Sequence, residues 1–120
     1  MKRDLDLTRN ILEQIEEKSN GMPGMVLDLP GHTENEVSYH VKVLSEAGLL
    51  TAMDLTDSMG LDWRPISLTW HGHEFLDAIR NETVWKKIKE TVKEKGGAIP
   101  FEILKTLAIQ FAGSVFGVGG

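Results

Sequence analysis

The stretch from Glu34 to Leu76 constrains the fold of this chain more than any other part of the sequence. Thr33 and Glu36 have the spacing of a capping box, in which two side chains bond the free amides at the start of a helix. Gly48 can end that helix, because glycine adopts the left-handed backbone conformation without strain. Two apolar-polar runs separated by a turn follow, so we predict a helix, an antiparallel hairpin and a further helix. The predicted strands are Leu49–Leu55 and Arg64–Thr69, with the turn at Asp57–Asp62.

A helix followed directly by a two-stranded hairpin is the second half of a winged helix-turn-helix. Residues Val37–Leu50 read VSYHVKVLSEAGLL, which is similar to the recognition helix of small bacterial winged-helix regulators. The predicted fold class is therefore mostly α with a small antiparallel β-sheet, a winged helix-turn-helix with extra C-terminal helices. The same fold also serves as a protein-protein interaction module, so it implies DNA binding only by analogy.

Helices are predicted on both sides of this stretch. The first runs from Asp4 to Lys18, and Met25–Leu29 reads as a third strand beside the hairpin, which leaves little room for a middle helix. Thr69 and Asn81 are candidate caps for two further helices, or for one kinked helix. We expect a winged-helix domain over residues 1–95 and a C-terminal helix with a flexible tail over residues 96–120. The predicted buried stripe of the first helix is Leu7, Ile11, Leu12 and Ile15, and that of the last helix is Phe101, Leu104, Ala108, Phe111 and Val115.

Composition limits what this chain can be. Its 120 residues are enough for one domain with a short appendage. It has no cysteine, so disulfides and thiolate metal sites are excluded. No signal peptide or membrane-spanning run is recognisable, so we expect a cytoplasmic protein that makes no membrane contact. The net charge of −5 counts against a simple DNA-binding regulator, because phosphate contacts require cations.

The chain as a whole resembles a known family. Four segments carry the resemblance: MKRDLDLTRNILEQIEE, EVSYHVKVLSEAGLL, LTWHGHEFLDAIRNETVWKKIKE and GGAIPFEILKTLA, of which the block Leu68–Lys87 is the most specific. They are similar to an uncharacterised family of small winged-helix-like proteins from bacteria and phages, a domain of unknown function of the DUF2513 type. The resemblance implies the winged-helix fold and carries no activity or ligand with it.

Two surfaces are candidates for contact with DNA. The first is the exposed side of the Thr33–Ala47 helix, where polar side chains can bond base edges or phosphates, although three glutamates on the helix oppose this. The second is the basic face of the Asn81–Lys95 helix, which also reads as an ordinary solvated surface. The predicted DNA-binding residues are Asn35, Ser38, Tyr39, Lys42, Lys86 and Lys87.

Other kinds of site are not predicted. His71 and His73 are two positions apart on a helix and point to different sides, so they do not form a metal site. His40 is expected to pack or to bond locally, and Trp63 is expected to be the most exposed of the three tryptophans. We find no phosphate-binding loop and no nucleophile or metalloprotease motif, so we expect no enzyme activity, no cofactor and no small-molecule ligand.

Two functions from different classes remain. In the first, the protein is a transcriptional regulator of bacterial or phage origin that binds double-stranded DNA as a homodimer. In the second, it is a protein-protein interaction module that binds no DNA and uses the winged-helix surface or the last helix. The apolar face of the last helix needs to be covered. We expect it either to pack on its own domain or to form a dimer contact with a second copy, since two-fold dimers are the commonest assembly.

Overall fold

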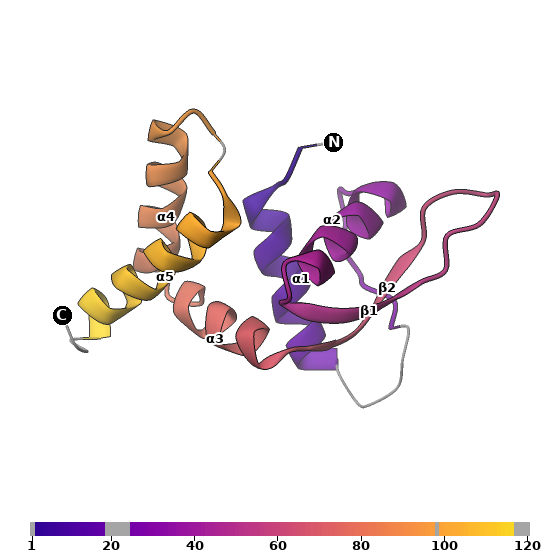
Figure 1. Ribbon diagram of the computed structural model, residues 1–120, viewed down its shortest axis with the longest axis horizontal. Helices are drawn as coiled ribbons and strands as arrows, with labels where there is room; N and C mark the ends of the chain where they lie inside the picture. Colours follow the sequence, from indigo (N-terminus) through magenta and orange to yellow (C-terminus); the bar gives the residue numbers. More distant parts are fainter. Residues whose placement is uncertain (1, 19–24, 98, 117–120) are drawn as a thin grey trace. The chain divides into compact units, whose positions relative to one another are not determined.

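The computed structural model describes residues 2–18, 25–97 and 99–116, with side chains described as far as Gly113. The chain forms two compact units, residues 1–73 and 74–120, and the boundary falls inside the helix α3 (Trp70–Ile79). The first unit contains α1 (Leu5–Lys18), α2 (Glu34–Glu46) and a hairpin of β1 (Leu50–Asp54) and β2 (Trp63–Leu68) (Figure 1). The second contains α4 (Glu82–Glu94) and α5 (Phe101–Phe116).

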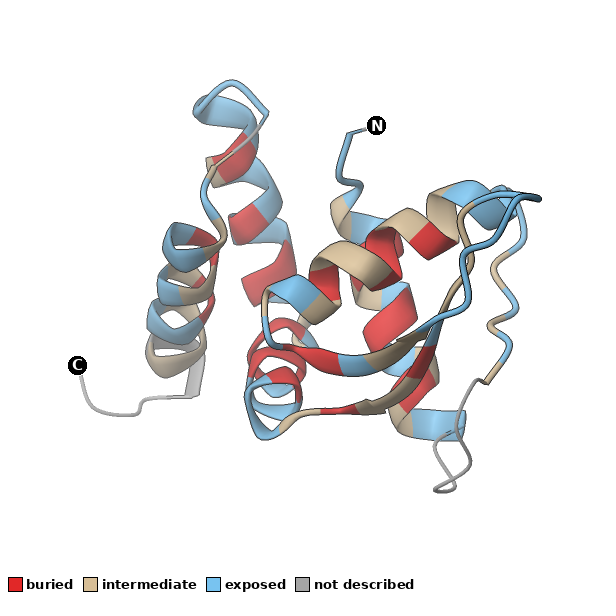
Figure 2. Cartoon of the chain, turned by 45° about the vertical axis from the view of Figure 1, so that its right-hand side comes forward, coloured by how far each residue is buried: buried red, intermediate tan, exposed pale blue. Residues whose placement is uncertain are grey.

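The core of the first unit lies between α1, α2 and the hairpin. Both helices contact β2 and each other, and α2 also contacts β1. The whole predicted stripe of α1 is buried, and Val41 and Leu44 of α2 are buried with it. Figure 2 shows buried residues along these elements, whereas the tip of the hairpin is exposed. The buried stripe predicted for α1 from its apolar spacing is therefore confirmed.

The ends of α2 are formed by the residues that the sequence indicated. The Thr33 hydroxyl accepts a hydrogen bond from the Glu36 amide at 3.1 Å. At the other end Gly48 has a φ of 80°, in the left-handed region. This conformation directs the amides of Gly48 and Leu49 back toward the last turn of α2. They bond the carbonyls of Ser45 and Leu44, both at 3.0 Å. This pair of bonds is a Schellman motif, and it directs the chain from α2 into β1.

The sheet has two antiparallel strands in the described part of the chain. Thr51 pairs with Ser67 and Ala52 pairs with Pro65, so Ile66 is an extra residue and forms a bulge. The predicted turn is present, because Asp57 and Gly60 exchange backbone hydrogen bonds at its tip. Both predicted strands are therefore confirmed: β1 is one residue shorter at each end than predicted, and β2 is shifted by one residue towards the N-terminus.

The prediction of a third strand at Met25–Leu29 is wrong. Only the Met25 amide bonds β2, at the Pro65 carbonyl (3.2 Å). Farther along, the side-chain amide of Gln14 bonds both the backbone amide and the carbonyl of Asp28. Because these groups are already occupied, the segment does not pair as a strand. None of its described residues is helical, so no middle helix precedes α2 there.

In the second unit α4 packs against α5. The Asn81 side chain caps α4 by accepting from the amides of Thr83 and Val84. This cap separates α4 from α3, so two helices are present rather than one kinked helix. The rings of Phe75 and Phe101 lie 5.6 Å apart. The buried residues of this unit's core are Phe75, Leu76, Ala78, Ile79, Val84, Trp85, Ile88, Val92, Leu104 and Ala108.

The expectation about tryptophan exposure is wrong. Trp70, the first residue of α3, is 76% exposed, whereas Trp63 is only partly exposed at the start of β2. The Trp63 amide is bonded to α2, which holds this end of β2 against the helix. Trp70 instead follows the cap residue Thr69, at a position where its side chain points outward.

Candidate nucleic-acid interface

Three of the predicted contact residues lie along one side of α2. Asn35 is exposed in the first turn, and Tyr39 and Lys42 are partly exposed farther along. They are separated by four and three positions, which places them on the same face of a helix. The Tyr39 ring packs edge-on against the His40 ring, with 5.5 Å between centroids. The tyrosine side chain is therefore held in position by the buried histidine.

Ser38 does not lie on this exposed face. Its side chain is buried, with 7% exposure, and its hydroxyl accepts a hydrogen bond from the Trp63 amide at 3.1 Å. The sequence placed Ser38 on the outer side because only its helical position was known. Its observed role is to tie α2 to the start of β2.

Lys42 lies near a carboxylate of the hairpin. The pKa of Asp54 is held below its ordinary value, mainly by hydrogen bonds from the Thr56 side chain and amide, and also by the charge of Lys42. Asp54 is therefore ionised at neutral pH and partly offsets the positive charge that Lys42 brings to this surface. Glu34 and Glu46, both exposed on α2, act in the same direction.

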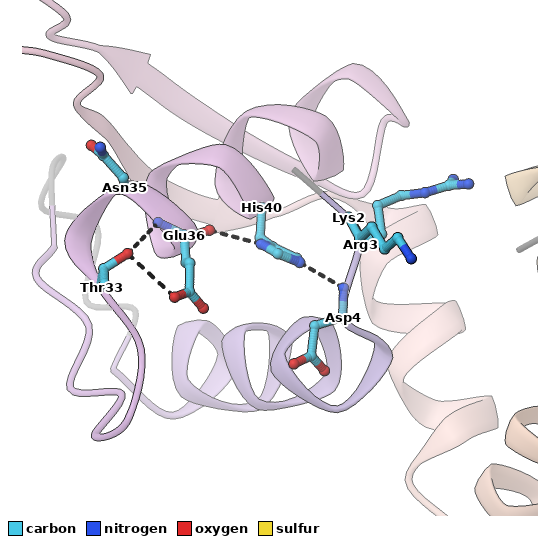
Figure 3. Close-up of a pocket in the computed structure, with 7 residues that line it drawn as sticks. All are labelled: Lys2, Arg3, Asp4, Thr33, Asn35, Glu36 and His40. Carbon is cyan, nitrogen blue, oxygen red and sulfur yellow. Dashed lines mark hydrogen bonds between the residues drawn. The ribbon is translucent and has the colours of Figure 1, made fainter. Parts of the chain in front are cut away.

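An open hollow lies where the starts of α1 and α2 meet (Figure 3). Its lining combines the segment before α1 with the first turns of α2, together with one buried histidine. The lining residues are Lys2, Arg3, Asp4, Thr33, Asn35, Glu36 and His40. The hollow thus adds two cations, Lys2 and Arg3, that the sequence-based prediction missed. Their position beside α2 could not be inferred from spacing along the chain.

His40 joins the two helices at this hollow. It is 2% exposed, and its Nδ1 donates to the Glu36 carbonyl at 2.7 Å. Its Nε2 accepts from the Asp4 amide at 2.8 Å, so the ring is the neutral tautomer with its proton on Nδ1. Asp4 also caps α1, because its carboxylate accepts from the Leu7 amide at 3.1 Å. The expected local bond of His40 is present, and a second bond reaches 36 residues back along the chain.

Glu36 keeps its charge at the edge of the hollow. Its carboxylate accepts from Nδ1 of His32 at 3.0 Å and from the Thr33 hydroxyl at 3.4 Å. Its pKa is lowered, first by the hydrogen bond with His32 and then by those with Thr33. The Thr33 backbone contributes as well, so the carboxylate is turned to the start of its own helix, as in a capping box.

Lys86 and Lys87 lie on α4, in the second unit. Both are exposed, and the Lys87 ammonium lies 5.9 Å from the centre of the Phe111 ring. Lys89, Lys93 and Lys95 are exposed on the same helix or at its end. α4 therefore presents a basic surface of its own, interrupted by Glu90 and Glu94.

Among the described residues, no group of three or more histidine, aspartate or glutamate side chains is placed to hold a metal ion. No described helix combines the length and apolar character that crossing a membrane requires.

Comparison with known proteins identifies the family. The fold is a mostly helical one with a small antiparallel hairpin, and residues 2–98 match the family described as Hypothetical protein (DUF2513). The chain belongs to this DUF2513 family. It is 39% identical over 109 residues to an uncharacterized protein of Haemophilus influenzae (strain ATCC 51907 / DSM 11121 / KW20 / Rd), covering 90% of this chain and 92% of that relative. No solved structure matches the chain.

Proposed function

We propose that the first unit is a winged helix without the usual middle helix, and that it binds double-stranded DNA as part of a transcriptional regulator. The supporting observation is the outer face of α2, where Asn35, Tyr39 and Lys42 lie together beside the hairpin that follows the helix. An α-helix fits the major groove of B-DNA, and an asparagine side chain can bond the edge of an adenine there.

In this arrangement α2 enters the major groove with its first turn leading. Asn35 contacts base edges, whereas Tyr39 and Lys42 contact backbone phosphates. Ser38 contributes indirectly, because its bond to the Trp63 amide fixes the hairpin against the helix. In the second unit, Lys86 and Lys87 on the basic surface of α4 provide further phosphate contacts.

The charges on this face determine how strong the binding is. Lys42 is the only cation on α2, and it is opposed by Glu34, Glu46 and the nearby Asp54. Acidic side chains repel phosphates, so we expect weak binding that falls steeply as the salt concentration rises. The proposal therefore makes opposite predictions for the two members of the Lys42–Asp54 pair.

The substitution Lys42→Glu is expected to weaken binding to random duplex DNA roughly tenfold, or ~1.4 kcal/mol. Asp54→Asn is expected to strengthen it by roughly two- to fivefold, because one repulsive charge is lost while the amide oxygen can still accept from Thr56. Fluorescence anisotropy at low salt measures both changes. Because Asp54 has a lowered pKa, mild acidification does not substitute for the mutation.

Lys18→Glu is the matched control for charge, since it makes the same change at the exposed C-terminal end of α1. It should leave the affinity within about twofold, because Lys18 lies at the opposite end of α1 from Asp4, which bonds α2. A wild-type protein that does not bind duplex DNA at low salt would refute the proposed function, and so would equal losses for Lys42→Glu and Lys18→Glu.

A second candidate function, self-association as an interaction module, is supported by the outer face of α5. Ile103 and Ile109 are 50% and 54% exposed and flank Thr106 on this face. If a second copy of the chain covers them, light scattering will show a dimer that Ile103→Glu with Ile109→Glu converts to a monomer. Lys18→Glu, an exposed change of charge on α1, is the control that should leave the dimer intact. A monomeric wild type would exclude this candidate.

A further inference from the structure

The segment before α1 is held in place beside α2. Lys2 and Arg3 are exposed, but the next residue, Asp4, is bonded on both sides. Its carboxylate caps α1 at the Leu7 amide, and its own amide donates to the buried His40 of α2. Because His40 is fixed in turn by the Glu36 carbonyl, the backbone that carries the two cations has a set position relative to α2.

The two cations lie on the hollow that Asn35 also lines. Figure 3 shows Lys2 and Arg3 extending on the side of the hollow opposite to Asn35, with His40 and Glu36 between them. In a DNA complex, base edges and backbone phosphates lie on different sides of a helix in the groove. The hollow thus separates a residue suited to base edges from two residues suited to phosphates.

The acidic groups that face the same hollow are already bonded within the protein. The Asp4 carboxylate accepts from the Leu7 amide, and the Glu36 carboxylate accepts from His32 and Thr33. Both carboxylates are therefore directed to the starts of their own helices. α2 itself carries three glutamates and one lysine, so cations for phosphate contact at this end of the helix must come from another segment.

We propose that Lys2 and Arg3 form a phosphate-binding arm that contacts the DNA backbone next to the bases approached by the first turn of α2. This inference rests on the proposed function and extends the contact surface to a segment remote in sequence from α2. The bond between Asp4 and His40 positions the arm, and the two side chains make the contacts.

The test is the salt dependence of binding to a fluorescein-labelled random duplex, followed by anisotropy between about 50 and 200 mM salt. For the double variant Lys2→Ala with Arg3→Ala, the slope of log K against log salt should become shallower by about 1.8, since each phosphate contact contributes about 0.9. The charge-conserving pair Lys2→Arg with Arg3→Lys should keep the wild-type slope. Single variants provide a matched comparison. Lys2→Ala should make the slope shallower by about 0.9, and Lys18→Ala should leave the slope unchanged.

The outcomes separate this inference from the proposed function. If the wild type binds and Lys42→Glu weakens binding, but the double variant keeps the wild-type slope, the arm is refuted and the proposed function stands. If the wild type does not bind duplex DNA, both fail. Circular dichroism of the double variant should match the wild type, because both side chains are exposed.

Discussion

Replacing Gly72 with alanine is expected to lower the free energy of unfolding by about 3 kcal/mol or more. Gly72 is buried in the first turn of α3, and a Cβ atom there would lie 1.9 Å from the Leu49 carbonyl oxygen. That oxygen cannot move away easily, because it accepts a hydrogen bond from the Thr69 amide. The Thr69 hydroxyl also joins the two segments, donating to the Gly48 carbonyl and accepting from the Gly72 amide.

The sign of the stability change in Gly72→Ala distinguishes a steric clash with Leu49 from an effect of helix propensity alone. If only helix propensity mattered, alanine would stabilise the helix by about 1 kcal/mol relative to glycine. Equilibrium unfolding in urea, followed by circular dichroism, measures the difference. His71→Ala is the control, since this exposed neighbour on α3 should change stability by no more than about 0.5 kcal/mol. A Gly72→Ala protein at least as stable as the wild type would show that the close backbone approach does not exist.

Replacing His40 with alanine is expected to cost about 2–4 kcal/mol. The ring is almost fully buried, so the smaller side chain leaves a cavity between α1 and α2. The Asp4 amide also loses its acceptor and the connection between the two helices is broken. The Glu36 carbonyl is affected less, because helical backbone bonding also uses it.

Urea unfolding again measures the total effect, and His71→Ala is again the control, because it makes the same chemical change at an exposed position. Hydrogen exchange adds a local measurement. The Asp4 amide should be protected in the wild type and should exchange faster in His40→Ala, beyond what the change in global stability explains. A loss of stability below about 0.5 kcal/mol would mean that the ring does not connect the helices.

Local signals in the sequence predicted much of this fold. The caps at Thr33, Thr69 and Asn81 and the helix end at Gly48 were all identified from residue type and spacing, because each depends on bonds within a few positions. The hairpin followed from two strand-forming runs with a turn between them. Asn35, Tyr39 and Lys42 were placed on one face of α2 for the same reason, since helical periodicity fixes relative positions.

Contacts between distant segments could not be predicted in this way. Ser38 is buried because the Trp63 amide, 25 positions away, bonds its hydroxyl. Met25–Leu29 has the composition of a strand, but Gln14 occupies the backbone groups of Asp28. The arm formed by Lys2 and Arg3 reaches α2 through His40. Each of these contacts depends on how the helices and the hairpin pack together. The residue pattern of a single segment does not give this information.

The proline in β2 limits what else the hairpin can pair with. On a β-strand the N–H and C=O of one residue point the same way, and the Pro65 carbonyl faces Met25, away from β1. At this position the outer edge of β2 therefore has no donor, and its acceptor is already bonded. A strand from another molecule finds neither partner there, so self-templated sheet growth from this edge, the usual start of amyloid-like aggregation, is disfavoured.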